Sequence, residues 1–86
     1  MFHRIFAVYD AKVGVYGQMF VARTREEGQR IFGDVVNDPN TVINRHPEDF
    51  HLFEIATFDD ANGTVLPHKA SDQLGKALEY VIRNKP

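Results

Sequence analysis

The hydrophobic positions of the chain follow the order strand, strand, helix, and they do so twice. Residues 4–9 and 16–22 alternate and are rich in β-forming side chains, and the short link between them predicts a hairpin. Thr24 then begins a capping box with Glu27, which is typical of a helix start. We therefore expect this helix to complete a first ββα unit over residues 1–37.

The second half of the chain repeats this order after a connecting segment at residues 38–50. Residues 51–58 and 64–68 predict another hairpin. Pro67 cannot donate a hydrogen bond to a neighbouring strand, so its strand is expected at an edge of the sheet. Ser71 is expected to cap a second helix, whose apolar residues recur at helical spacing. These residues are Leu74, Ala77, Leu78, Val81 and Ile82.

The two units, residues 1–37 and 51–86, predict a single α+β domain in ββαββα order. We expect a four-stranded, mostly antiparallel sheet with both helices on one face. Several residues of the two units match at a spacing of 47 positions, among them Phe6 with Phe53. An internal ββα duplication and a chance match both stay open as explanations of this spacing.

Both faces of the predicted sheet are apolar, whereas two helices can cover only one of them. Phe6 is expected to point into the core, as is Phe53. The other face would stay uncovered, and exposed apolar patches usually mark interaction sites. We therefore expect a homo-oligomer, most simply a dimer, formed through this face or through an edge strand. The expected interface residues are Ile5, Tyr9, Leu52 and Phe58.

The composition fits a small globular domain, with 43% apolar and 26% charged residues among 86. No cysteine is present, so disulfides are excluded and a reducing cytoplasm is the natural environment. No apolar run reaches the roughly 20 residues that span a bilayer, and the N-terminus does not fit a signal peptide. We therefore expect a cytoplasmic protein with no membrane partner.

Neither an enzyme nor a cofactor site is expected from the motifs of the chain. Nothing resembles a nucleophile motif, a phosphate-binding loop or a dinucleotide fingerprint. The adjacent carboxylates of Glu48 and Asp49 are typical of a solvated turn rather than of an acid–base pair. His46 and His51 flank them, but the spacing matches no zinc signature. No metal site is therefore expected.

Five stretches are the most distinctive parts of the sequence. They are Ala7-Val8-Tyr9-Asp10, Val36-Asn37-Asp38-Pro39, His46-Pro47-Glu48-Asp49-Phe50, Leu52-Phe53-Glu54-Ile55, and Phe58-Asp59-Asp60 before Gly63. Together they resemble the small nonstructural protein of gokushoviruses, the small icosahedral single-stranded DNA phages of the Microviridae. The resemblance implies a DNA-binding protein, in the cytoplasm of the bacterial host cell, that takes part in the switch from duplex replication to the production of packaged single strands.

The resemblance assigns no residue to DNA contact, so the candidates come from the chemistry of single-strand binding. Such a site needs cations that follow the backbone and flat groups that stack on bases. The N-terminus of the first predicted helix adds partial positive charge to the arginines around it. The candidates are Arg23, Arg25 and Arg30 at this helix, Arg4 and Arg45 as further cations, and Tyr16 as the stacking group.

The net charge of −2 opposes non-specific DNA binding, because such binding gains affinity when Lys and Arg displace counterions. It therefore keeps a second function open. In this alternative, the chain is an oligomeric protein-interaction module of the phage cycle. It would contact host replication or capsid-assembly factors without binding DNA directly.

Overall fold

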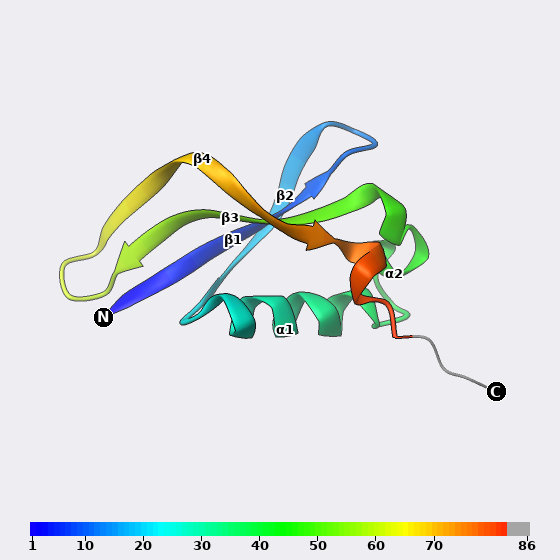
Figure 1. Cartoon of the computed structure of the whole chain (residues 1–86), viewed down its shortest axis with the longest axis horizontal. Coiled ribbons are helices and arrows are strands. Elements are labelled where there is room, and N and C mark those ends of the chain that lie inside the picture. The colour runs from blue at the N-terminus through cyan, green and yellow to red at the C-terminus, as the bar shows by residue number, and fades with distance from the viewer. Residues whose placement is uncertain (83–86) are drawn as a thin grey trace.

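A computed structural model describes residues 1–82 of the chain. The strands are β1 (Phe2–Asp10), β2 (Val15–Ala22), β3 (Phe50–Asp59) and β4 (Thr64–Lys76). The helices are α1 (Arg25–Val36) and α2 (Val42–Arg45), with 3-10 turns η1 (Pro47–Asp49) and η2 (Ala77–Tyr80) (Figure 1). None of the helices in this range has the length and apolar character that crossing a membrane requires. The last four positions of the predicted second unit, residues 83–86, lie outside the described residues.

The four strands form one antiparallel sheet in the order β2-β1-β3-β4. α1 lies along one face of this sheet, and no helix within residues 1–82 covers the opposite face (Figure 1). We call that opposite side the open face. The arrangement confirms the predicted α+β class and the four-stranded antiparallel sheet. It also confirms that the strand containing Pro67 lies at an edge.

The core lies between α1 and the sheet. Phe6 of β1, Leu52 of β3 and Phe32 of α1 are all buried in it. Gly28 brings α1 close to β1, because a Cβ atom at this position would overlap the Phe6 ring. This close approach explains why a residue with poor helix propensity stands inside the helix.

The helix that was predicted to begin at Ser71 is absent. β4 continues through Ser71 to Lys76, and in the described part of the chain η2 follows it. The strand can continue because β3 is long enough to pair with it as far as His51, which lies opposite Lys76. Gly75 within this stretch has a φ of 125°, which a helix cannot contain. Of the predicted apolar stripe, Ala77 is buried, whereas Leu78 and Ile82 are exposed.

The predicted orientation of β3 is wrong by one residue. Leu52 is 0% exposed and contacts the core, so it cannot belong to an exposed interface. Phe53, its neighbour, is half-buried on the open face instead. Glu54, two positions after Leu52, also lies on the core side, where it is 1% exposed and its carboxylate is ion-paired. Because Phe6 is a core residue and Phe53 is not, their 47-residue match does not place them in equivalent environments.

The connecting segment is folded rather than a loose link. The hydroxyl of Thr41 accepts a hydrogen bond from the Asn44 amide and so caps α2. The side-chain amide of Asn44 donates to the Val36 carbonyl at the end of α1. Ile43 of α2 is buried in the core. These contacts hold α2 and η1 against the end of the sheet where β3 begins.

Candidate functional site

Four aromatic rings from three neighbouring strands gather on the open face. Tyr9 of β1 lies between Tyr16 of β2 and Phe53 of β3, with centroid distances of 4.8 and 6.0 Å. The rings of Tyr16 and Phe53 are 5.6 Å apart, and His51 of β3 lies 6.4 Å from Tyr9. We call Tyr9, Tyr16, His51 and Phe53 the aromatic cluster.

Strand register explains why these side chains share a face. Tyr9 pairs directly with Tyr16 on one side and with His51 on the other. Directly paired residues of antiparallel strands project to the same side, and Phe53 is two positions from His51. Tyr16 is 50% exposed and the other rings are half-buried. The cluster therefore presents ring surface to solvent while each ring is held by its neighbours.

The surroundings of the cluster are apolar along the strands and basic at one border. Ile5, Met19 and Val21 continue the same face, as the pairs Ala7 with Met19 and Ile5 with Val21 show. Met19 is 64% exposed and Val21 is 51% exposed. Lys76 lies opposite His51 at the edge of the sheet. None of these open-face positions carries a carboxylate.

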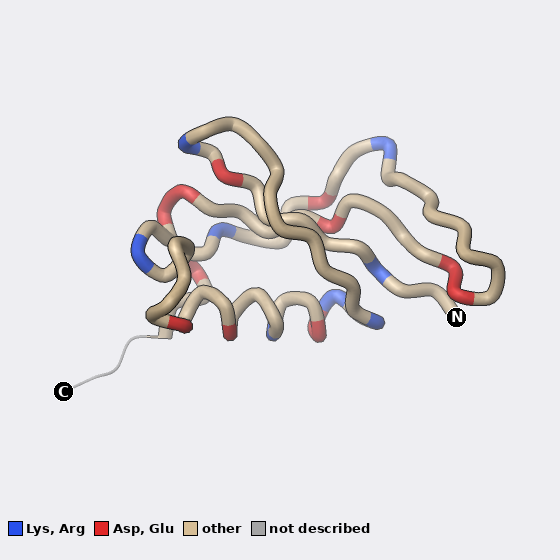
Figure 2. Tube along the Cα trace, turned by 180° about the vertical axis from the view of Figure 1, so that it is seen from behind, with Lys and Arg blue, Asp and Glu red and all other residues tan. Residues whose placement is uncertain are grey.

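The five arginines that were predicted to bind DNA do not form one cluster. Figure 2 shows Lys and Arg scattered among Asp and Glu along the trace. Arg23 and Arg30 are exposed near the start and in the middle of α1, and Arg45 is exposed at the end of α2. Among the described residues, these three make no ion pair. Tyr16, the predicted stacking group, belongs instead to the aromatic cluster.

The remaining two arginines bind a buried carboxylate. Arg4 Nη1 donates hydrogen bonds to both oxygens of Glu54, at 3.1 and 3.0 Å. Arg25 Nε donates to Glu54 at 3.0 Å, and its Nη2 donates to Asp72 at 2.7 Å. His68 Nε2 lies 2.7 Å from the second Glu54 oxygen. Arg4 and Arg25 are therefore structural ion-pair partners, and less of their charge is free for a ligand.

The Glu54 carboxylate stays ionised because of these partners. Burial raises the pKa of its carboxyl, but the hydrogen bonds from His68 and Arg25 and the charge of Arg4 outweigh burial. The pKa of Glu54 therefore lies below its ordinary value of 4.5. In turn, the Glu54 hydrogen bond and charge raise the pKa of Arg25. The network joins β1, the start of α1, β3 and β4.

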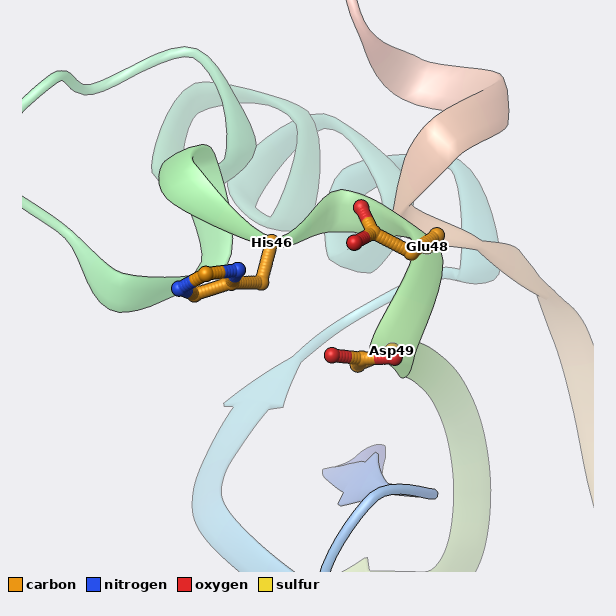
Figure 3. Close-up of side chains that lie close together, drawn as sticks. All are labelled: His46, Glu48 and Asp49. Atoms are coloured by element: carbon orange, nitrogen blue, oxygen red, sulfur yellow. The ribbon is translucent and has the colours of Figure 1, made fainter.

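A second group of polar side chains lies at the opposite end of the molecule. His46, Glu48 and Asp49 place ligand atoms within 4.8 Å of one another (Figure 3). They line a cleft of about 370 Å³ together with Asp10 and Lys12. An imidazole and carboxylates can bind a divalent cation. Since His46 and Glu48 are exposed, however, they are also satisfied by water, and their closeness carries no metal assignment.

The expected oligomer residues divide between two environments. Ile5 and Tyr9 are half-buried on the open face. Phe58 is half-buried near the start of β1, with its ring 6.1 Å from that of His3. Phe53 and His51 were missed as functional candidates because β3 was read with the wrong face outward. If Glu54 is assigned to the core as a buried ion-pair partner, the alternation of β3 places His51 and Phe53 on the opposite, open face.

Comparisons with known proteins identify the family of the chain. "Protein ORF5" of Chlamydia phage 1 is 35% identical over 66 residues, which cover 72% of this chain and 69% of that protein. No solved structure gives a significant match. A sequence model of the family described as "Phage ORF5 protein" matches residues 3–80. Because this match spans nearly the whole described chain, the protein belongs to the Phage ORF5 protein family.

Proposed function

We propose that this phage protein binds single-stranded DNA on the open face of its sheet, without enzymatic activity, inside the bacterial host cell. It would act when the phage changes from duplex replication to the production of genome single strands. The observation that carries the proposal is the aromatic cluster, which spans three adjacent strands on a face that none of the described helices covers.

Aromatic rings on a sheet suit single strands because unpaired bases stack on them whatever their sequence. Each stacked base contributes about 1–3 kcal/mol. Tyr16 is the most exposed ring and would meet a base first, whereas Tyr9 and Phe53 hold it in place. The two tyrosines could also donate hydrogen bonds to the strand.

The charge distribution supports this face over the α1 side. The open-face positions next to the cluster, Ile5, Met19 and Val21, carry no carboxylate, and Lys76 lies at the border of the cluster opposite His51. On the α1 side, Glu26 and Glu27 lie in the first turn beside the exposed arginines. A local positive potential can exist on one surface of a chain whose net charge is −2.

The test is fluorescence anisotropy with a labelled oligothymidylate, repeated over a salt series. The wild type is expected to bind, with an affinity that falls as salt rises. Tyr16→Ala should weaken binding by about tenfold, because one stacking platform is removed. Tyrosine fluorescence gives an independent reading, since the chain has three tyrosines and no tryptophan, and two of those tyrosines are in the cluster.

Leu66→Ala is the matched control, because Leu66 is also an exposed residue of an edge strand but lies outside the cluster. It should bind as the wild type does. The arginines that the sequence predicts as a DNA site at α1 are tested with the double variant Arg23→Ala, Arg30→Ala. This variant leaves the Arg25 ion pairs intact. If this double variant loses affinity while Tyr16→Ala does not, the site is at α1 and not on the open face.

The alternative function is a protein-interaction module that contacts host replication or capsid-assembly factors. The exposed Met19 and Val21 favour it, because they give the open face an apolar margin that DNA does not require. Absence of binding to single strands even at low salt would support this alternative. Binding that disappears steeply with salt would support the DNA function.

A further inference from the structure

We propose that β2 pairs with β2 of a second copy of this chain, so that two sheets join edge to edge in a symmetric dimer. β2 and β4 are the two edge strands of the sheet. Each edge presents backbone donors and acceptors that its single neighbour cannot use. The two edges differ in how well their sequences prevent such pairing.

The β4 edge carries several devices that block another strand. Pro67 lacks a backbone donor, and Lys69 and Asp72 place charges along the strand. The register also jumps between the pairs Ala56 with Pro67 and Glu54 with Asp72, so residues 68–71 leave the ladder. Asp72 is further tied to Arg25. A second chain therefore meets an interrupted and charged edge here.

The β2 edge carries none of these charges or prolines. Its sequence, Val-Tyr-Gly-Gln-Met-Phe-Val-Ala, has no charged residue and no proline. Six of its eight residues are exposed, and within the described chain it pairs only with β1. One irregularity lies opposite β1 between Ala7 and Tyr9, and the pairing from Met19 to Ala22 is regular. This regular stretch can accept a partner strand.

A second copy fits this edge better than an unrelated partner. Two β2 strands bring no like charges together, although the whole chain has a net charge of −2. Antiparallel pairing of identical strands is self-complementary, which is what a two-fold interface requires. Met19 and Val21, exposed in the single chain, would face their counterparts across the new pair.

The dimer would keep the open faces of both copies on one side of an eight-stranded sheet. A two-fold axis perpendicular to the sheet relates antiparallel neighbours, so both α1 helices would lie on the other side. This pairing leaves the aromatic clusters uncovered, unlike a dimer formed through the open face itself. It does not depend on DNA binding, and its test needs no DNA.

The test is sedimentation velocity of the full chain over a range of micromolar concentrations. The wild type is expected to be a dimer. Val21→Lys should raise the dimer dissociation constant by about tenfold or more, because two lysines would meet near the axis. Val65→Lys is the matched control, since Val65 of β4 is 50% exposed and Val21 is 51% exposed. It should leave the dissociation constant unchanged.

Hydrogen exchange of the wild type supplies a reading that does not depend on a variant. Backbone amides of β2 should exchange more slowly as the protein concentration rises, whereas those of β4 should not. The proposal is overturned by a wild type that stays monomeric, or by Val65→Lys weakening the dimer as much as Val21→Lys does. Should Val21→Lys fail to fold by circular dichroism, exchange in β2 that is independent of concentration overturns it alone.

Discussion

The chain contains two antiparallel hairpins, and the segments that follow them differ. β2 ends at Ala22 and the chain turns into α1, a helix of 12 residues. β4 continues to Lys76, and the short turn η2 follows it within the described residues. In sequence, the stretches that begin at Thr24 and at Ser71 are alike, because each starts with a hydroxyl residue and contains apolar residues at helical spacing. The difference therefore comes from what surrounds each segment.

Thr24 works as a cap because its neighbours support it. Its hydroxyl accepts a hydrogen bond from the Glu27 amide, and the Glu27 carboxylate accepts one from the Arg23 amide. Ser71 has Leu74 three residues later, so no side chain can return such a bond. Gly75 then interrupts the segment with its positive φ.

Contacts with β3 and α1 stabilise the segment that begins at Ser71 as a strand. Gln73 Nε2 lies 2.8 Å from His51 Nδ1, and Asp72 binds Arg25. These contacts to β3 and α1 exist only if the segment stays extended. Apolar periodicity alone could not reveal them, because they join residues far apart in the chain. Apolar residues at helical spacing therefore predict a helix only where a neighbouring strand is too short to pair with the segment.

The largest effect is expected at Gly28, whose counterpart 47 positions later is Gly75. Gly28→Ala should lower the free energy of unfolding by about 3 kcal/mol, because the added methyl group overlaps the buried Phe6 ring. Urea denaturation followed by circular dichroism measures this. Gly33→Ala is the control in the same helix, since its Cβ would lie 3.7 Å from the Tyr80 ring.

Gly33→Ala should raise the free energy of unfolding by up to about 1 kcal/mol through better helix propensity. Gly75→Ala should be destabilising for a different reason, because its φ of 125° disfavours any side chain. Equal effects of the three substitutions would contradict the close packing of α1 on β1.

The next effect is expected at Glu54, which binds residues of both hairpins. Glu54→Gln should lower the free energy of unfolding by about 2 kcal/mol, because Arg4 and Arg25 lose their carboxylate and His68 loses its ionised hydrogen-bond partner. Asp60→Asn is the control, since Asp60 is an exposed carboxylate that binds the N-terminus and His3 beside the turn between β3 and β4. It should have a much smaller effect.

The loss at Glu54 should also depend on pH. The pKa of Glu54 is lower in the folded chain than its ordinary value of 4.5, so the folded state binds this proton less readily than the unfolded state does. The stabilisation is therefore fully present above that value and is lost as the pH falls through the folded pKa. Wild type and Glu54→Gln should converge in stability in acid. A constant difference between them down to acid pH would refute the ion-pair account.

The smallest change in stability is expected for alanine substitutions of the two hydroxyl residues, Thr24 and Ser71. Thr24→Ala should lower the free energy of unfolding by about 1 kcal/mol, because the first turn of α1 loses its cap. Ser71→Ala should change it by less than about 0.5 kcal/mol, because Ser71 is exposed within a strand. Thermal and urea unfolding of both variants would measure the difference. Equal losses would indicate that Ser71 also caps a helix in solution.

The local parts of the fold could be predicted from the sequence. The alternation in residues 4–9 and the capping box at Thr24 led to β1 and α1, and Pro67 led to an edge strand. These signals act between residues close in the chain. Tyr16 was expected in a DNA site and Tyr9 in an oligomer interface, and the structure brings the two rings together in the aromatic cluster.

The remaining features depend on contacts that no local pattern contains. Glu54 can be buried because Arg4 of β1, Arg25 of α1 and His68 of β4 bind its carboxylate, and its burial agrees with the inward direction of Leu52 on the same face of β3. That face in turn decides that Phe53, and not Leu52, joins the aromatic cluster. The orientation of β3 therefore moves Leu52 from the predicted interface into the core, and Phe53 from the predicted core to the open face.

The strand order has a consequence for how the protein folds during synthesis. β1 and β3 form the centre of the sheet, although the entire helix α1 and the connecting segment separate them in the chain. The first hairpin and α1 leave the ribosome before β3 exists, with the core side of β1 unfinished. We therefore expect the nascent chain to remain unfolded until β3 has emerged, and the sheet to form late and cooperatively.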